Sequence, residues 1–453
     1  MRRDGRRLDC GPYMSGALEA KIRLEQMVCE KQPLADLCLG GRSGLVNAGR
    51  ITRIWVDGPS FGVPFLTSTS ILQSDLSDLR FISKRAVEAN PQLIVRRGYT
   101  LITRAGTIGR MSYTRPDMDG MACTEDVLRV IPDDRRVQPG YLYAFLSSDF
   151  GVSLVTSGTY GAIIQHIEPE HIAGLPVPRL GGKTEQSAHG LVELAASNQS
   201  QAVELLKLAE ELVHNILKTG KYAKSDTHLW SSVESSLIQN RADAYYYSDA
   251  CKAARRAFDA ADVGQHCQLS DVAEVFIPGI FKRRYAEDPH FGVPYITGGD
   301  VFQLAPKSER YLLHKVVDEH QLGIREGTIL VQEAGQLGGL IGRSVMVGTY
   351  LDGFAVSNNM VRIKAHDRRD AGFLFALLST DEGVRLIARE AAGSSIPHMD
   401  ASRLRRIRIP WPDSERRRAI SQPVDEAIRL RDVAAHSEDD ARNLVERAIR
   451  DAP

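Results

Sequence analysis

The hexapeptide Phe61-Gly62-Val63-Pro64-Phe65-Leu66 recurs 230 positions later as Phe291-Gly292-Val293-Pro294-Tyr295-Ile296. Other stretches return in the same order and at nearly the same spacing: residues 98–106 as 327–335, 108–110 as 341–343, and 141–147 as 373–379. Single positions follow, with Gly161, Ile164, His166 and Pro178 matched by Gly393, Ile396, His398 and Pro410. Solenoid units are only about 20–50 residues long, so this repeat predicts two tandem modules, 1–222 and 223–453.

Length and composition are typical of a multidomain globular protein. The 453 residues are 43% hydrophobic and 25% charged, and no aliphatic run approaches a membrane span. Basic residues at the N-terminus are not followed by an apolar run, so we expect no secretory signal. We expect a cytoplasmic location. The six cysteines (Cys10, Cys29, Cys38, Cys123, Cys251 and Cys267) form no C-x-x-C pair, which predicts reduced thiols and no metal site.

Each module changes character along its length. Its first part contains short β-branched and aromatic runs broken by Gly and Pro, such as residues 50–56 and 100–103, which indicate a strand-rich domain. Residues 141–147 and 373–379 read as short buried helices. Pro and most Gly then vanish after Pro178, and a long helix follows. The predicted fold class is α+β, with mixed α/β domains at 1–182 and 223–412 and helical spacers at 183–222 and 413–453.

Both spacers carry an apolar face. In the first, the face is formed by Leu191, Leu194, Ala195, Ala202, Leu205, Leu206, Ala209, Leu212, Val213 and Ile216, and Gly220 stands at the expected helix end. In the second, an a/d seam runs through Ile420, Val424, Ala427, Arg431, Ala434, Glu438, Ala441, Val445 and Ala448. We expect the two helices to pack on each other as an antiparallel coiled coil. The alternative is that each helix only covers its own domain.

A formal charge of +0 excludes a uniformly basic nucleic-acid binder and leaves local clusters as candidate phosphate contacts. The candidates in the first module are Arg53, Arg104, Arg110, Gln165 and His166; those in the second are Lys282, Arg283, Arg284, Arg343 and His398. The two histidines could instead order a turn before a helix. Gly62, Gly106, Gly109, Gly335 and Gly342 are interpreted as turn residues that need a positive φ.

These features together resemble the specificity subunits of Type I restriction-modification systems, or of a related methylation-linked defence system. The resemblance covers almost the whole chain. It is carried by R-x-D-A-x-Y-Y at 241–247, by G-x-x-L-I-x-R-x-G-T-I-G-R at 98–110, and by the stretches 161–178 and 393–410. The chain departs from the pattern at 7–13, where the tyrosine-rich opening is missing. It also has Gln332-Glu333 opposite Thr103-Arg104. Glu333 could repel a phosphate where Arg104 could bind one, so the two modules need not touch DNA through equivalent residues.

The resemblance implies a non-catalytic subunit with two target-recognition domains. It would direct one or two adenine-N6 methyltransferase subunits, and a restriction subunit where one exists, to a DNA target. S-adenosylmethionine would be bound by the partner methyltransferase, with no cofactor in this chain. Two different domains held by helices about one DNA turn long predict a bipartite, asymmetric target with an unread spacer.

Two other classes of function stay open. A DNA-acting enzyme would need a site that the sequence does not reveal: Gly181-Gly182-Lys183-Thr184 lacks the remaining glycine of a phosphate-binding loop, and no Asn-Pro-Pro-aromatic motif is present. A sparse nuclease signature is still compatible with the sequence. A scaffold in an anti-phage defence complex, without sequence-specific binding, is the other alternative.

Overall fold

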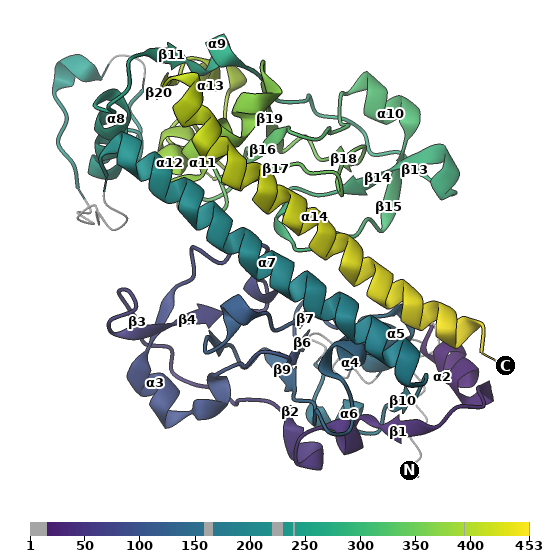
Figure 1. The fold of residues 1–453 in the computed structure, drawn as a ribbon. Helices are drawn as coiled ribbons and strands as arrows, with labels where there is room; N and C mark the ends of the chain where they lie inside the picture. Colours follow the sequence, from purple (N-terminus) through teal and green to yellow (C-terminus); the bar gives the residue numbers. More distant parts are fainter. Residues whose placement is uncertain (1–15, 158–165, 220–229, 239–240, 394, 453) are drawn as a thin grey trace. The chain divides into compact units, whose positions relative to one another are not determined.

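The computed structural model describes residues 16–157, 166–219, 230–238, 241–393 and 395–452. The chain divides into two compact units (Figure 1). Unit 1 comprises Met1–Ser200 and Val433–Pro453, and unit 2 comprises Gln201–Asp432. Each unit therefore contains part of both long helices, α7 (Gly182–Leu217) and α14 (Ser414–Arg450). The fold is a mixture of helices and small sheets, as the sequence predicts at this level.

The two units repeat one strand plan. Unit 1 has sheets of order β2-β9-β6-β7, β3-β5-β4-β8 and β1-β10, and unit 2 has β12-β19-β16-β17, β13-β15-β14-β18 and β11-β20. The strands of unit 1 are β1 (Lys31–Pro33), β2 (Leu45–Val46), β3 (Trp55–Val56), β4 (Gly62–Leu66), β5 (Phe81–Ser83), β6 (Thr100–Thr103), β7 (Met111–Tyr113), β8 (Ala122–Cys123), β9 (Val127–Val130) and β10 (Pro176–Pro178). Those of unit 2 are β11 (His266–Gln268), β12 (Ala273–Phe276), β13 (Tyr285–Ala286), β14 (Gly292–Ile296), β15 (Arg310–Leu313), β16 (Ile329–Gln332), β17 (Ser344–Met346), β18 (Ala355–Val356), β19 (Met360–Ala365) and β20 (Arg408–Pro410).

The short helices repeat in a matching order. Unit 1 contains α2 (Ala17–Gln26), α3 (Lys84–Ala89), α4 (Pro139–Leu146), α5 (Asp149–Ser157) and α6 (Pro169–Ile172). Unit 2 contains α8 (Asp249–Asp259), α9 (Leu269–Val272), α10 (His314–Glu319), α11 (Ala371–Ser379), α12 (Asp381–Ala388) and α13 (Ala401–Arg405). Helices α4 and α11 are the predicted buried helices, and their interior residues are buried on all sides. Duplicated sequence has therefore produced duplicated structure.

The hexapeptide repeats form β4 and β14, the central strands of one sheet in each unit. β4 pairs antiparallel with β5 and parallel with β8, and β14 pairs in the same way with β15 and β18. A Cβ on Gly62 would lie 2.6 Å from Val56 and 2.7 Å from Phe81. Gly62 thus serves close strand packing and has no positive φ, which corrects the prediction of a turn. Gly106, Gly109, Gly335 and Gly342 do have the predicted positive φ.

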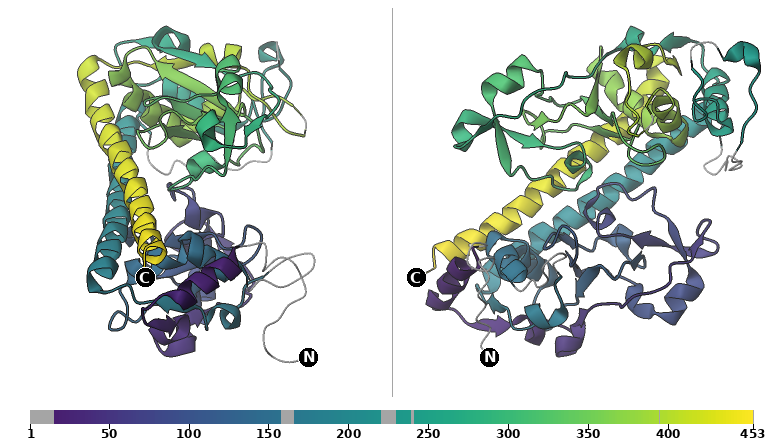
Figure 2. Two further views of the ribbon diagram at one scale, coloured as in Figure 1. Left: turned by 90° about the vertical axis from the view of Figure 1, so that its right-hand side faces the viewer. Right: turned by 180° about the vertical axis from the view of Figure 1, so that it is seen from behind.

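Helices α7 and α14 contribute side chains to the core of each unit. In unit 1 the main core cluster contains Ala188 and Val192 of α7 with Ala441 and Val445 of α14. In unit 2 it contains Val213 of α7 with Ile420 and Val424 of α14. Within each unit the sheets lie to one side of these helical segments (Figure 2). None of the described helices combines the length and apolar character that a membrane crossing requires.

Several of the predicted packing residues differ in burial. Leu191, Leu205 and Leu212 are half-buried against the core clusters, and Ile216 is buried. Leu194 is 46% exposed and lies outside the core. At the end of α14 the buried residue is Ile449 rather than Ala448, because an α-helix drifts by about 20° per heptad from a strict a/d register. Helix α7 ends at Leu217, followed by Lys218 at φ 53; Gly220 lies outside the described residues.

Candidate nucleic-acid interface

The loop between β8 and β9 contacts two of the candidate residues of unit 1, Arg53 and Arg104. The Arg53 guanidinium donates to Thr124 Oγ1 at 3.0 Å and to the Glu125 carboxylate at 3.1 Å, and lies 3.8 Å from Asp126. It also lies over the Phe65 ring, 5.5 Å from the ring centroid. The backbone N–H of Arg104 donates to the Asp126 carbonyl at 3.0 Å. Arg53 and Arg104 therefore meet around the same loop, although they are 51 positions apart in sequence.

The side chain of Arg104 is engaged inside the unit. Its guanidinium pairs with Glu168 and donates to the Ile167 carbonyl at 3.2 Å. Only 14% of its side chain is exposed. His166, half-buried, immediately precedes Ile167, and Arg110 is joined to Thr103 through its backbone; Gln165 lies outside the described residues. Arg104 is thus held by a carboxylate, and a DNA phosphate would have to compete with Glu168 for it.

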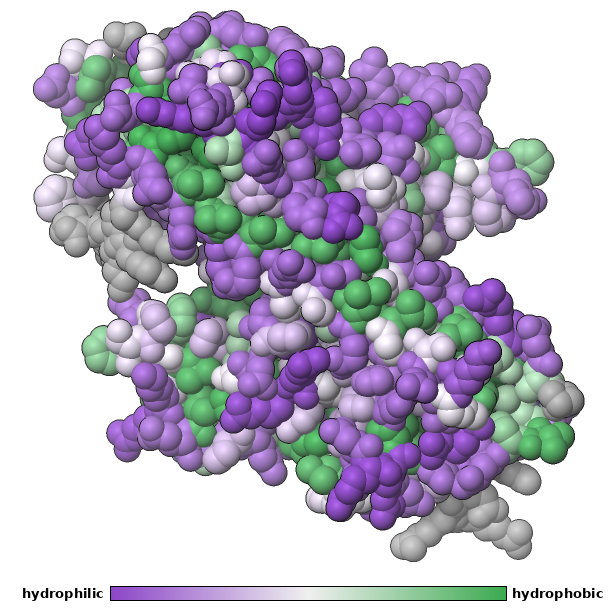
Figure 3. Space-filling model, in the orientation of Figure 1, coloured by the Kyte–Doolittle hydropathy of each residue, from purple (hydrophilic) through white to green (hydrophobic). Residues whose placement is uncertain are grey.

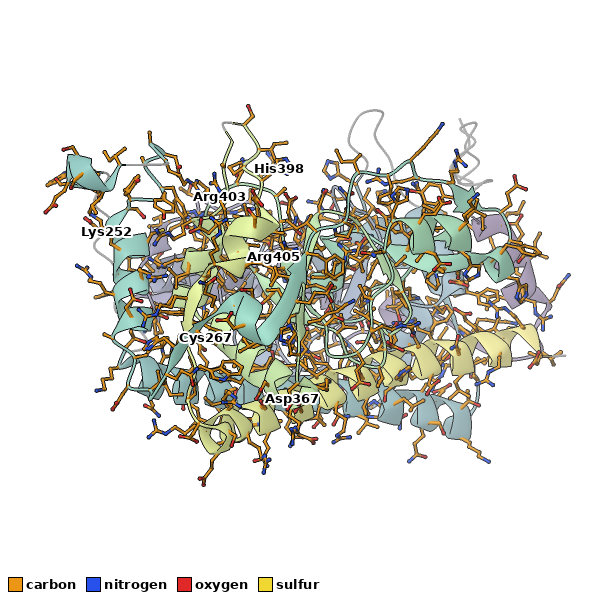
Figure 4. All side chains as sticks on the ribbon, turned by 90° about the horizontal axis from the view of Figure 1, so that it is seen from above. Lys252, Cys267, Asp367, His398, Arg403 and Arg405 are labelled. Atoms are coloured by element: carbon orange, nitrogen blue, oxygen red, sulfur yellow. The ribbon has the colours of Figure 1, made fainter. Side chains whose placement is uncertain are left out.

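At the matching position unit 2 has an acidic residue where unit 1 has the basic Arg104. Glu333, which occupies the repeat position of Arg104, accepts a hydrogen bond from His398 Nδ1 at 3.0 Å. The Glu333 side chain is 8% exposed and that of His398 is 58% exposed. Figure 4 shows His398 and Arg403 at the margin of unit 2 that points away from α14, whereas Asp367 lies close to α14. The carboxylate that the sequence suggests as a phosphate-repelling group is therefore buried behind an exposed histidine.

The other candidates of unit 2 lie on a neighbouring stretch. Lys282, Arg283 and Arg284 are exposed and directly precede β13. Arg283 is the repeat counterpart of Arg53, and the neighbouring Tyr295 hydroxyl raises the pKa of its guanidinium. Arg343 is half-buried, and its Nε donates to the Gly339 carbonyl at 3.3 Å. The structure thus brings Arg283 to the place that Arg53 has in unit 1, without assembling all five candidates at one point.

Two arginines that the sequence analysis does not single out hold the β8–β9 and β18–β19 loops. Arg129 is 1% exposed and donates to the carbonyls of Thr124 at 3.2 Å and Val127 at 2.6 Å. Arg362, fully buried, donates to the carbonyls of Ser357 at 3.2 Å and Met360 at 2.6 Å. Burial lowers the pKa of Arg129 and lowers that of Arg362 to about 10. Both guanidinium groups stay charged at neutral pH, and each fixes the loop that precedes it.

The candidate side chains of both units are hydrogen-bond donors. Among the described residues, no group of three or more His, Cys, Asp and Glu side chains could hold a metal ion. The two units present guanidinium and imidazole groups on matched strand plans, with different residues at matched positions. Such donors suit phosphate oxygens and the edges of bases.

No protein-family model matches the chain, and no curated protein matches it either. Among solved structures, the chain is similar to the S subunit of a Type I restriction-modification system from M. genitalium. The identity is 10% and the TM-score 0.37, over 94% of this chain and 96% of that chain.

Two further solved structures are similar over a comparable length. One is the HsdS subunit from Thermoanaerobacter tengcongensis, with 12% identity and a TM-score of 0.28 over 94% of this chain and 97% of that chain. The other comes from work on complex assembly and conformational transition of the type I R-M system, with 15% identity and a TM-score of 0.29 over 93% and 97%.

Proposed function

We propose that the chain is a non-catalytic specificity subunit that recognises a bipartite, asymmetric DNA target. The observation that carries this proposal is the duplication itself: two units share one ten-strand plan and differ in their polar residues at matched positions. Similar frameworks with different surface donors are what reading two different half-sites requires. Each good bidentate contact to a base discriminates by about 1–3 kcal/mol, and joining two readers multiplies their selectivity because the second contact becomes intramolecular.

The long helices would set the spacing between the half-sites as an antiparallel coiled coil. Early residues of α7 share the unit 1 core with late residues of α14, whereas late residues of α7 share the unit 2 core with early residues of α14. A third cluster joins Ala202 of α7 with Ala427 and Leu430 of α14. This order of neighbours is what antiparallel pairing demands. A 36-residue helix is about 54 Å long at 1.5 Å per residue, enough to span about one turn of DNA.

The same helices would provide the docking surface for partners. Figure 3 shows apolar residues gathered along the course of α7 and α14 on the face that it draws. Leu194 and Leu208 of α7 are 46% and 47% exposed. The partners would be one or two adenine-N6 DNA methyltransferase subunits, which bind S-adenosylmethionine, and a restriction subunit where the system has one. The chain itself would hold no cofactor.

The experiment that tests this proposal maps N6-methyladenine in cells. The chain is co-expressed with the methyltransferase encoded beside it, and genomic DNA is sequenced by a single-molecule method. A two-part methylated motif should be present with the chain and vanish without it. Methylation of unchanged motif and extent in the absence of the chain would refute the proposal.

A unit-specific variant sharpens the same experiment. Replacing Lys282, Arg283 and Arg284 together by Ala should weaken or relax one half of the motif and leave the other half intact. Arg325→Ala, at an exposed arginine of unit 2 that pairs with Asp352, is the matched control and should leave the whole motif unchanged. Equal weakening of both halves would argue against one half-site per unit.

A further inference from the structure

Each unit exposes one phenylalanine at the start of its repeated hexapeptide. Phe61 is 70% exposed and Phe291 is 67% exposed. They occupy the same repeat position, directly before β4 and β14. A single exposed apolar side chain needs no explanation, but an exposed ring that recurs at the same position of both copies points to a shared use.

Basic side chains lie beside each ring. In unit 1 the strand register places Lys84 opposite Phe61, and the Lys84 backbone N–H donates to the Phe61 carbonyl at 3.0 Å. The Lys84 ammonium group donates to the Ser60 carbonyl at 3.0 Å, and Arg85 next to it is exposed. The counterparts in unit 2 are His314 and Lys315, both exposed. The ring and two basic residues therefore form one surface feature, present twice.

The same small sheets carry a second repeated pair. In unit 1 the Arg80 guanidinium lies 3.8 Å from the centroid of the Trp55 ring. In unit 2 Arg310 lies 5.3 Å from the centroid of the Tyr285 ring. Strand β3, which carries Trp55, pairs with β5, which begins directly after Arg80, and β13, which carries Tyr285, pairs with β15, which begins at Arg310.

This combination fits duplex DNA better than an apolar protein surface. Fixed cations displace condensed counterions from phosphates, and an apolar ring at the same place can pack on bases or enter a base step. Acidic residues are present as well: Asp57 and Glu88 in unit 1, and Glu287 and Asp288 in unit 2. Asp288 is engaged with the backbone N–H of His290 at 2.9 Å.

We propose that Phe61 and Phe291 are paired DNA contacts, one for each half-site, whose rings pack against bases while the adjacent basic residues hold the phosphates. This inference rests on the proposed function and deepens it by naming a contact that both units share. It assigns a role to two apolar residues, whereas the candidates named from the sequence are all hydrogen-bonding residues. Packing on bases supports affinity for any sequence, whereas hydrogen bonds to base edges provide discrimination.

The test measures binding of the purified chain, alone and together with its methyltransferase, to two probes. The first is a fluorescein-labelled duplex with the motif found by methylome mapping, and the second is a labelled duplex pool of random sequence. Phe61→Ala and Phe291→Ala should each weaken binding to both probes by about tenfold. Phe61→Trp and Phe291→Trp should retain most of the affinity because they keep a ring. Val28→Ala and Leu39→Ala, which remove apolar side chains of unit 1 that are 85% and 52% exposed, should bind like the wild type.

Each result decides the inference. Unchanged affinity of both alanine variants would overturn it, and if those variants instead lost the methyltransferase during purification, the rings would be protein contacts. If the wild-type chain bound the motif duplex no more tightly than the random pool, the proposed function would be refuted, yet the two alanine variants would still test the rings on that pool. If the wild type bound no duplex in either form, the inference would fall together with DNA binding.

Discussion

Units 1 and 2 share a backbone plan but differ in how their charges are satisfied. In unit 1 Arg53 is bound by Glu125, whereas unit 2 has Arg283 and the uncharged Asn358 at the matching positions of the repeat. Arg104 of unit 1 pairs with Glu168, and the same place in unit 2 holds the Glu333–His398 pair. The comparison teaches that strand topology and buried positions have been kept, while the polar residues around the loops have diverged.

What has been kept includes an uncommon feature. Arg129 and Arg362 occupy the same place in β9 and β19, and each donates only to backbone carbonyls among the hydrogen bonds described. A buried arginine without a carboxylate partner is rare, so its presence in both units indicates that the loop it fixes is needed in both. The loop backbone is therefore the constant part, and its side chains are the variable part.

The largest effect expected from this comparison concerns stability. Arg129→Met and Arg362→Met should each lower the free energy of unfolding by about 3 kcal/mol, because hydrogen bonds from a charged donor are lost and buried carbonyls are left unsatisfied. Urea unfolding followed by circular dichroism measures the change. The two losses should be similar in size, since the two sites have the same geometry.

Surface arginines provide the matched controls for this pair of variants. Arg135 and Arg369 have side chains that are 83% and 77% exposed, and both pair with an aspartate two residues earlier, Asp133 and Asp367. Arg135→Met and Arg369→Met should change stability little. If the buried variants lost no more than these controls, the guanidinium groups would not hold the loops.

The sequence predicted the larger features of the fold because they depend on long patterns. The repeat predicted two equivalent units, and the loss of Pro and Gly after Pro178 predicted a helix where α7 lies. Residues 50–56 were expected to be a strand, but only Trp55–Val56 is one. Leu194 has a helical spacing from its apolar neighbours on α7 but is exposed, so spacing alone does not tell which apolar positions the core of a unit covers.

The candidate site was only partly predictable, since contacts across the fold decide it. No local pattern indicates that Glu168 would neutralise Arg104, 64 positions away. Glu333 looked like a phosphate-repelling group in sequence, and only its burial behind His398 shows otherwise. Arg129 and Arg362 did carry a signal, because the arginine recurs between hydrophobic residues in both copies, and a residue-by-residue comparison of the repeats would have found it.

A moderate effect is expected on the salt dependence of DNA binding. Because Glu125 and Asp126 neutralise Arg53 in the free chain, Arg53→Gln should change the slope of log K against log salt only slightly. Arg283→Gln should reduce that slope by about one, the value for one lost phosphate contact. Titrations of a labelled duplex at several salt concentrations measure both slopes.

The isosteric variant Glu125→Gln tests the reason for this difference. This variant removes the charge that holds Arg53 and keeps an acceptor for the hydrogen bond. Arg53 can then contact a phosphate, as we expect of Arg283, so the slope of log K against log salt should become steeper. Glu204→Gln, which removes an exposed carboxylate from α7, controls for the same change in net charge. Equal slopes for Arg53→Gln and Arg283→Gln in the wild-type background would show that Glu125 does not mask Arg53.

The smallest effect concerns pH and the ends of the long helices. His214 near the end of α7 is matched in the repeat by Glu446 near the end of α14. The hydrogen bond with Glu210 and the charges of Glu382 and Asp381 raise the pKa of His214 above its usual value, against the opposing effect of burial. Its Nδ1 also lies 2.8 Å from Thr219 Oγ1. Glu446 instead accepts a hydrogen bond from the Asp149 backbone N–H at 2.9 Å. Only the position on α7 therefore has an imidazole, the side chain whose charge changes near neutral pH.

The sign of the pH effect follows from the direction of that shift. The folded state binds the His214 proton more tightly than the unfolded state, so this stabilisation is fully present below about pH 6.5 and is lost as the pH rises through the folded-state pKa. His214→Gln should remove that pH dependence from the urea midpoint between pH 5.5 and 8, whereas His290→Gln, at an exposed histidine of unit 2, should retain it. An equal pH dependence of the urea midpoint in His214→Gln and in the wild type would contradict this prediction. The end of α7 would then not respond to pH near neutrality, as we expect for the end of α14.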